Sequence, residues 1–370
     1  MRASDIVRSL LRRCIRRIHA TRLLTLLAAV DALVRGGRAS LTHLGRSLLA
    51  ATTAKHRIKR IDRLLGNARL HRDLRLLYDA LTRRLIGESL RPLIIVDWTQ
   101  LHGDWWALSA AVPFGGRALP IYNEVHRSSG NGRAAQHRRF LRALRQFVPL
   151  HCRPTLIVDA GFCKPFWEAC REEGFDLLVR LRPSGTLRAW RPERSATARE
   201  LARRATSRAK CLGEWVVYAA NCRGELLRVV CAKRTIHRAR KDDRPYRQRA
   251  VEPWVLATTR RDLSADEVVA LYAQRMKIEE LFRDAKNSRY GWSLAHAGNR
   301  SAKRLAALLL ITSLALVAVM LLGQAAEAAG CARFLQANSI RNRRVLSFFR
   351  VGELILNEYA ARRKILKLKA

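Results

Sequence analysis

Hydrophobic and polar positions change their spacing along the chain. Up to residue 90, Leu, Ile and Val recur every three or four positions among arginines, which predicts amphipathic helices. Beyond that point short apolar runs replace this period. The runs "IIVD" and "LIVD" predict two buried strands that end at Asp97 and Asp159, and the segment 131–148 between them predicts a helix. Strands that alternate with helices predict an α/β domain behind a helical N-terminal region.

Further strand signals lie on both sides of a polar interruption. The segment 105–126 predicts two strands joined by a Gly-Gly turn, and "PWVLATT" at 253–259 predicts another strand. Residues 185–250 are polar and basic, with only short strand candidates. We interpret them as a β-rich insertion that ends in a basic loop at 233–250.

The helix predicted after this insertion has an unusual polar flank. A capping-box pattern at residues 264–267 begins it, and the helical period then continues through "LYAQRMKIEELFRDAK" at 271–286. At about 100° per residue, one narrow strip along the edge of the apolar face contains four polar residues. These residues are Tyr272, Arg275, Glu279 and Lys286. Glu280 points elsewhere, so the geometry selects Glu279 over its neighbour.

One segment complicates the picture of a soluble protein. Residues 305–323 carry no charge and have transmembrane length. Lys303 and Arg304 precede them, as at a cytoplasmic membrane boundary. The alternative is a helix buried on most sides within a large α/β core. Because its Thr, Ser and Ala content makes it a poor lipid-facing helix, we expect a buried helix and no membrane partner.

Composition narrows the class of partner. The chain has 370 residues, of which 49% are hydrophobic, so it can bury a sizeable core. Its formal net charge is +41, spread along the whole length. Such a chain repels itself unless a polyanion neutralises it, which favours nucleic acid over an anionic membrane surface. The eight cysteines lack zinc-knuckle spacing, and we expect reduced thiols in a cytosolic protein.

Three carboxylates form a candidate metal site. If the strands that end at Asp97 and Asp159 are neighbours, their side chains converge at one sheet edge, and Glu279 supplies a third carboxylate from a packed helix. Three carboxylates repel one another unless cations lie among them, and Mg²⁺ is the first choice for oxygen ligands. Two such ions about 4 Å apart assist phosphoryl transfer. Taken singly, an aspartate at a strand end is more often a turn residue.

The segment 53–71 is the most basic part of the N-terminal helices. Lys55, Arg57 and Arg60 flank a few apolar positions there, and Gly66 with Asn67 predicts the end of the helix. A solvated basic face is one interpretation of this segment. The density of like charges favours contact with DNA.

The order and spacing of these motifs resemble a known family. The four residues of the polar strip fit the pattern Y-(2)-R-(3)-E-(6)-K, the signature of bacterial DDE transposases of the insertion sequence 4 family. The segments "KHRIKRIDRLLGN", "IIVDWTQL" and "LIVDAGF" extend the similarity over most of the chain, and "RMKIEELFRDAKNSRYG" is similar to the cut-and-paste branch. The resemblance implies an α/β fold with an RNase H-like mixed-sheet catalytic core, interrupted by a β-rich insertion. A helical N-terminal domain and a helical C-terminal tail complete it.

The resemblance also implies domain boundaries and a catalytic triad. Asp97, Asp159 and Glu279 would be the catalytic, metal-binding residues, with two Mg²⁺ ions per site and Mn²⁺ tolerated. The implied segments are a helical DNA-binding domain at 1–90, the core at 91–184 and 251–325, the insertion at 185–250 and a helical C-terminal region at 326–370.

Other residues would hold DNA. By the same resemblance, Tyr272, Arg275 and Lys286 would grip phosphates at the transposon end. Trp254 would hold a flipped base in a hairpin intermediate, although a tryptophan on a strand is often a plain core residue.

A protein of this kind would bind the inverted-repeat ends of its own insertion sequence as a homodimer. It would excise the element through a hairpin intermediate, join the 3′-OH ends to target double-stranded DNA, and work on the nucleoid in a bacterial cytoplasm. Two alternatives share the fold: an RNase H-like nuclease and an inactive, domesticated DNA-binding relative. A basic chromatin- or RNA-binding protein is the alternative from another class, and it would show no metal dependence.

Overall fold

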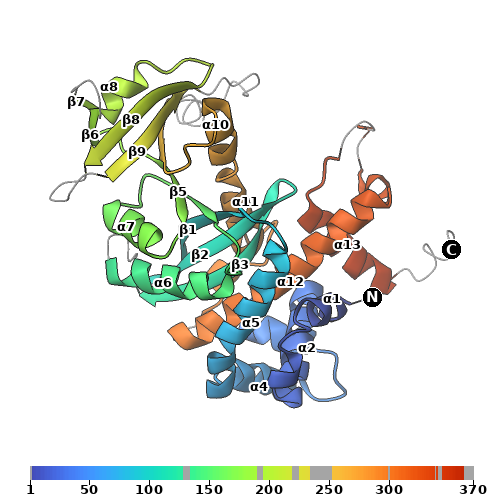
Figure 1. Ribbon diagram of the computed structural model, residues 1–370. Helices are drawn as coiled ribbons and strands as arrows, with labels where there is room; N and C mark the ends of the chain where they lie inside the picture. Colours follow the sequence, from blue (N-terminus) through green and yellow to red (C-terminus); the bar gives the residue numbers. More distant parts are fainter. Residues whose placement is uncertain are drawn as a thin grey trace.

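The computed structural model describes residues 2–127, 134–189, 195–218, 225–233, 252–298, 301–337, 339–340 and 344–361. Figure 1 shows a mixed α/β protein in which helices of the N- and C-terminal regions pack beside a large twisted sheet. Most of the basic loop predicted at 233–250 lies outside the described residues.

Helices fill the N-terminal region, and local capping explains several of their ends. Ser40, Thr53 and Asn67 each accept a hydrogen bond from a backbone N–H in the first turn that follows. Gly66 closes one helix, as predicted, whereas Asn67, predicted at the same helix end, begins the next. The helices are α1 (Ala3–Leu10), η1 (Ile15–Arg17), α2 (Ala20–Gly36), α3 (Leu41–Ser47), α4 (Ala54–Leu65) and α5 (Ala68–Ile86).

Ten strands within the described residues form one mixed sheet, in the order β3-β2-β1-β4-β5-β10-β9-β8-β6-β7. Strand β1 is antiparallel to β2 and parallel to β4, and β4 is parallel to β5. The Gly-Gly turn predicted between β2 and β3 is present, with positive φ at both glycines. The core strands are β1 (Leu93–His102), β2 (Trp105–Phe114), β3 (Arg117–Arg127), β4 (Thr155–Val158), β5 (Asp176–Arg180) and β10 (Trp254–Thr258).

The insertion continues the core sheet instead of forming a sheet of its own. Strand β9 pairs with β10, β8 with β9, and β6 with both β8 and β7. These strands project as a lobe at the far end from the N- and C-terminal helices (Figure 1). Its elements are β6 (Thr186–Ala189), β7 (Ser195–Thr197), α8 (Ala198–Ala202), β8 (Lys210–Tyr218) and β9 (Glu225–Ala232).

Neighbouring residues of β3 show how the sheet is covered. Tyr122 stacks on Phe140 of α6 (Ala134–Phe147), whereas the Asn123 amide donates to the Ser313 hydroxyl of α12 (Ala302–Ala328). Successive strand residues face opposite sides, so α6 and α12 cover opposite faces of the sheet. Tyr78 of α5 contacts both Tyr122 and Asn123, so α5 covers the outer edge of β3. Helix α7 (Lys164–Glu172) packs beside α6.

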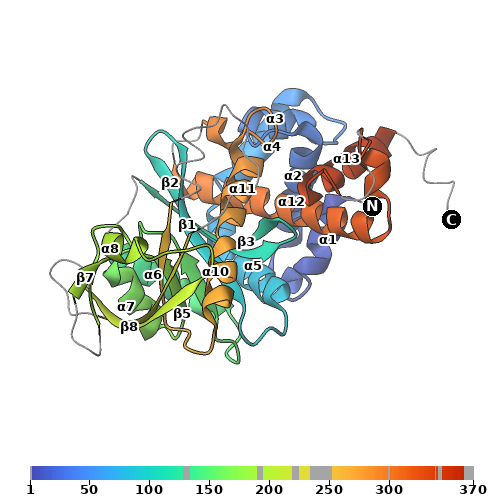
Figure 2. The ribbon, with the colours of Figure 1, turned by 90° about the horizontal axis from the view of Figure 1, so that it is seen from above.

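Helix α12 is the long apolar segment predicted at 305–323. In length and composition it is the one helix of the described part that would suit a membrane span, with a mean hydropathy of 2.8 in its most apolar window. In the structure 89% of that window is buried inside the protein, against α2, β3, α5 and α13 (Phe348–Ala361). Figure 2 shows α12 among α1, α2 and α13. A helix surrounded on all sides needs no polar face, which explains its composition.

Candidate active site

The two predicted aspartates belong to neighbouring parallel strands, Asp97 within β1 and Asp159 directly after β4. The register pairs Ile95 of β1 with Ile157 of β4, and extending it by two residues sets Asp97 opposite Asp159. Residues at the same register of parallel strands face the same side of the sheet. The adjacency predicted from the sequence is therefore present.

The prediction that Asp97 ends its strand is wrong. Strand β1 continues through Asp97 to His102, because residues 97–102 pair with β2 beyond the point where pairing with β4 stops. Asp159 does follow the last residue of β4, and its Oδ1 accepts a 2.8 Å hydrogen bond from the N–H of Gly161. Arg182 fixes this turn by donating to the carbonyls of Ala160 and Gly161.

The single helix predicted from residue 264 to residue 286 is two helices. The capping box at Ser264 and Glu267 begins α10 (Ala265–Ala273), and α11 (Met276–Lys286) follows after a break. At the break the N–H of Arg275 bonds to the carbonyl of Tyr272, and that of Ile278 bonds to the carbonyl of Arg275, in the three-residue pattern of a tighter turn. The predicted continuous strip is therefore interrupted between Tyr272 and Glu279.

The break places Arg275 between two of the predicted catalytic carboxylates. Its Nη1 lies 2.9 Å from Asp97 Oδ2, and its Nη2 lies 2.5 Å from Glu279 Oε1. The side chains of Arg275 and Asp97 are each 15% exposed, whereas that of Glu279 is 41% exposed. The Arg275 guanidinium thus connects Asp97 on a strand with Glu279 on a helix, 182 positions apart in the sequence. The contact lies at the edge of the core, next to solvent.

Asp97 is the most strongly perturbed member of the group. Burial raises the pKa of its carboxyl to about 7, and the Asp159 and Glu279 carboxylates act in the same direction. The Arg275 guanidinium and the N–H of Trp98 oppose the rise in this pKa. Because Asp159 and Glu279 both act on Asp97, the three carboxylates share one electrostatic environment.

Lys286 meets the same strand from the other end of α11. Its Nζ donates to the Thr99 hydroxyl at 2.7 Å and to the Gln100 carbonyl at 3.2 Å, and it lies over the Phe282 ring. Burial lowers the pKa of the ammonium group, and Asp97 acts against that change. Lys286 and Arg275 therefore both contact β1, within three residues of Asp97 on the strand.

Tyr272 and Trp254 lie together in an apolar cluster. Their rings are 5.0 Å apart in an edge-to-face arrangement, and Tyr272 is 4% exposed. Burial raises the pKa of the Tyr272 hydroxyl to about 12. In this structure the tyrosine predicted to grip phosphate and the tryptophan predicted to hold a base pack on each other beside Ile157 and Leu178.

The predicted basic residues of α4 lie away from this site, among the N-terminal helices. Lys55 is exposed, Arg57 donates to the Leu48 carbonyl, and Arg60 donates to the Thr25 hydroxyl. Arg60 also lines a groove of about 930 Å³ between α2, α4 and α5. The other basic side chains on its walls are His19, Arg22, His56, Arg63, Arg69 and Arg72.

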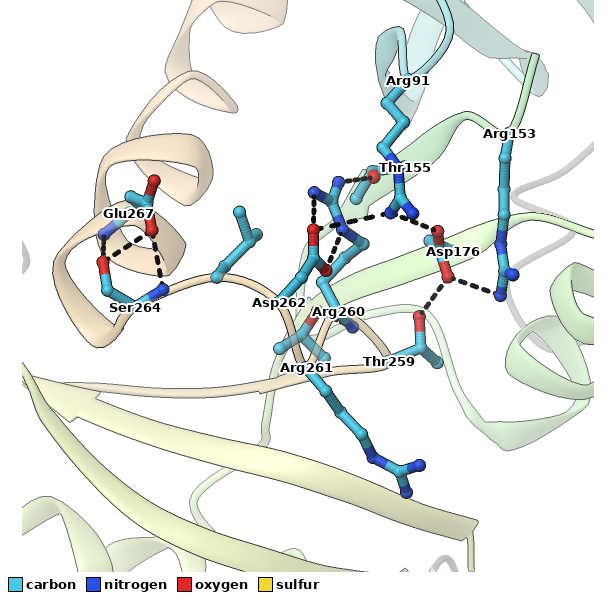
Figure 3. A network of polar contacts seen from close by, with 12 residues as sticks. Arg91, Arg153, Thr155, Asp176, Thr259, Arg260, Arg261, Asp262, Ser264 and Glu267 are labelled. Carbon is cyan, nitrogen blue, oxygen red and sulfur yellow. Dashed lines mark hydrogen bonds and ion pairs between the residues drawn. The ribbon is translucent and has the colours of Figure 1, made fainter.

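A network of polar contacts that the sequence did not reveal anchors the start of α10 (Figure 3). Arg260 follows β10 and donates to both carboxylate oxygens of Asp262 and to the Thr155 hydroxyl at the start of β4. Asp176, 2% exposed, accepts from Arg153 and Thr259. No short motif marks these residues, since they meet only when β4, β5 and β10 are adjacent.

The donor chemistry of the site suits a hard divalent cation, since all three predicted ligands are carboxylates. Within the described ranges, however, no three Asp, Glu, His or Cys side chains lie close enough together to coordinate one metal ion. Arg275 instead bonds to one oxygen each of Asp97 and Glu279. The residues therefore fit the ion in kind and in charge, whereas their placement among the described residues does not form a ligand group.

Comparison with known proteins supports a nucleic-acid enzyme. A family model described as the transposase DDE domain matches residues 88–316. No match was found among curated proteins. The matched range begins just after α5 and includes β1, the insertion, α10 and α11, together with more than half of α12.

Proposed function

The chain belongs to the family of transposase DDE domains, because the family match covers more than half of its length, and on that premise we propose a cut-and-paste transposase of the insertion sequence 4 type. It binds the inverted-repeat ends of its own insertion sequence, excises the element and joins the 3′-OH ends to target DNA. DNA is the partner of this family, and the formal charge of +41 supports such a partner.

The observation that carries the proposal is the Arg275 bridge between Asp97 and Glu279, beside the strand that Asp159 follows. Asp97 lies on β1, Asp159 directly follows the neighbouring parallel strand β4, and Arg275 bridges Asp97 to Glu279 of α11. We propose these three as the catalytic triad. Bound to them, two divalent ions, Mg²⁺ first and Mn²⁺ as a substitute, would supply the charge needed to activate an attacking oxygen and stabilise a leaving one.

The residues of the chain contribute position and charge. Asp97 and Glu279 are oriented by β1 and α11, and Asp159 by the turn after β4 that Gly161 and Arg182 hold. Each reaction step is an in-line attack on a phosphodiester, first by water, then by a freed 3′-OH that closes a hairpin, then by water that opens it, and last by the 3′-OH on target DNA. One triad suffices for all four steps, and no covalent link between protein and DNA forms.

DNA binding would use several surfaces. We propose that Arg275, Lys286 and Tyr272 hold phosphates of the transposon end after local rearrangement, and that Trp254 then holds a flipped base. Lys55, Arg57 and Arg60 would contact the terminal repeat from the N-terminal region. Two protomers would pair the two ends, and the protein would act on the nucleoid of a bacterial cytoplasm.

The experiment is to incubate the protein with Mg²⁺ and DNA that contains its own gene with both flanks. Double-strand breaks at the element boundary, with hairpin ends, are the expected result. Asp97→Asn should reduce cleavage about a thousandfold, since several kcal/mol of charge stabilisation depend on that carboxylate. End binding should stay nearly intact, and loss of binding would instead indicate a structural role for Asp97.

Strand-transfer assays separate this function from the alternatives. A nuclease on the same fold cuts and does not join, and an inactive relative does neither. A non-catalytic nucleic-acid-binding protein shows no dependence on Mg²⁺ or on the three carboxylates.

A further inference from the structure

Arg275 forms the cross-link at the centre of the carboxylate group. Its two side-chain hydrogen bonds in the described part of the chain go to Asp97 and to Glu279, one from each terminal nitrogen. A guanidinium has five N–H donors in a rigid fork, and phosphate oxygens match that fork as well as carboxylates do. Arg275 can therefore donate its hydrogen bonds to a phosphate in place of a carboxylate, without losing any of them.

The same bonds conflict with a metal ion. A divalent cation held by Asp97 and Glu279 would compete with Arg275 for their negative charge, and the guanidinium charge would repel it. The cation and Arg275 are thus competitors for one pair of carboxylates. Asp159 is outside this competition, since its Oδ1 accepts from the backbone of Gly161.

The surroundings allow Arg275 to leave toward solvent. It stands at the break between α10 and α11, and its side chain caps no backbone group of α11. The Glu279 side chain, on the outer side of the bridge, is 41% exposed. A DNA phosphate that approaches from solvent would reach Nη2 first. Lys286 does not duplicate the bridge, because its ammonium bonds to Thr99 and Gln100.

We propose that Arg275 is an internal counter-cation that closes the carboxylate site in the DNA-free protein, and that a DNA phosphate opens the site by taking over its guanidinium. This inference rests on the carboxylate triad of the proposed function. Its consequence is positive coupling between DNA and the divalent cation. By linkage, each increases the affinity for the other by the same factor, typically about 5- to 150-fold.

The test measures Mn²⁺ binding, by calorimetry and by the loss of the free-ion paramagnetic resonance signal, in the full chain without DNA. Arg275→Gln should bind Mn²⁺ at least about tenfold more tightly than the wild type, within the usual range of such couplings. Arg283→Gln is the matched control. It removes the same charge from an exposed side chain on the same helix, where it pairs with Glu280, and it should leave Mn²⁺ affinity unchanged.

A second set of titrations adds a duplex of about 40 base pairs taken from the boundary of the chain's own gene. The wild type should then gain Mn²⁺ affinity, and Arg275→Gln should gain little, because its site is already open. Thermal unfolding supplies an independent readout. Without Arg275 the carboxylates repel one another, so Mn²⁺ should raise the Tm of the variant more than that of the wild type.

The outcomes separate this inference from the proposed function. Suppose that the wild type binds Mn²⁺, that Asp97→Asn abolishes this binding, and that the Arg275→Gln variant binds Mn²⁺ no more tightly than the wild type. The counter-cation role is then wrong, and the triad stands. If neither protein binds Mn²⁺ with or without DNA, the triad itself is wrong and the counter-cation role falls with it. Arg275→Lys provides a second variant if glutamine impairs folding. It keeps the charge and loses the fork, so its DNA-free affinity should lie between the other two.

Discussion

The ammonium group of Lys286 donates a 2.7 Å hydrogen bond to the hydroxyl of Thr99, and this bond attaches the last turn of α11 to β1. Thr99 is 6% exposed and lies two residues beyond Asp97 on the same strand. With Arg275 at the other end of α11, the helix that carries Glu279 is held to β1 at two points.

Thr99→Val tests this attachment. The variant removes the acceptor and keeps the shape, so we expect a loss of about 1 kcal/mol in the free energy of unfolding, with no change in the salt dependence of DNA binding.

Lys286→Met removes the charge instead. If Lys286 also contacts a phosphate in the complex, the slope of log K against log salt concentration should fall by about one unit. An unchanged slope would show that Lys286 only bonds to β1 and does not contact a DNA phosphate.

The hydrogen bonds of Arg260 should stabilise the folded protein more than the ion pair of the adjacent Arg261 does. Arg260 is 8% exposed and bonds to the half-exposed Asp262 and to the buried Thr155, so Arg260→Ala should cost about 2–3 kcal/mol of unfolding free energy through the loss of charge-assisted hydrogen bonds. Arg261 is the adjacent control. Its side chain is 62% exposed and pairs with Glu214, so Arg261→Ala should cost less than about 1 kcal/mol. Urea unfolding at pH 7 measures both, and equal losses would contradict the assignment.

His137 should make the protein acid-sensitive. Burial lowers its pKa to about 4 from the ordinary value of 6.5, with a further contribution from His126. Between those two values the unfolded chain binds a proton that the folded protein does not, so this residue makes stability fall as the pH drops from 6.5 toward 4. His137→Gln should weaken that slope. Unfolding free energies of both proteins at pH 4.5, 5.5 and 7 check the prediction, and parallel curves would refute it.

Glycine permits the close approach of α13 to α12. A Cβ at Gly352 would lie 1.9 Å from the backbone oxygen of Val319, and backbone cannot move aside as a flexible side chain can. Gly352→Ala should therefore displace α13, with a loss of about 1–3 kcal/mol and faster proteolysis of the C-terminal region. Asn357→Ala, at an exposed position of the same helix, is the control and should be near neutral. Thermal unfolding and limited trypsin digestion measure the two effects.

Local signals in the sequence were sufficient for most individual elements. The runs before Asp97 and Asp159 are buried strands, and the capping box at Ser264 begins a helix. The apolar segment at 305–323 is a buried helix. Each of these signals depends on neighbours within a few positions, so a pattern of side chains is enough to encode it.

The break between α10 and α11 was not predictable in this way. The residues around Gln274 and Arg275 include no glycine or proline, and their helix propensities give no stop signal. The cause lies in packing. Tyr272 of α10 belongs to the apolar cluster over β5 and β10, whereas Ile278 of α11 belongs to the main core beside β1 and β3. A tighter turn between the two helices lets each half fill its own cluster.

The sequence by itself therefore determined the individual elements and the candidate residues, because periodicity, capping and charge are local properties that survive in the unfolded chain. Only the tertiary structure decided how those residues meet: Asp97 within its strand and not at its end, Tyr272 in the core, and Arg275 between Asp97 and Glu279. These contacts join positions up to 182 residues apart, and they depend on strand order and on which cluster each helix packs against. No local pattern specifies those relationships.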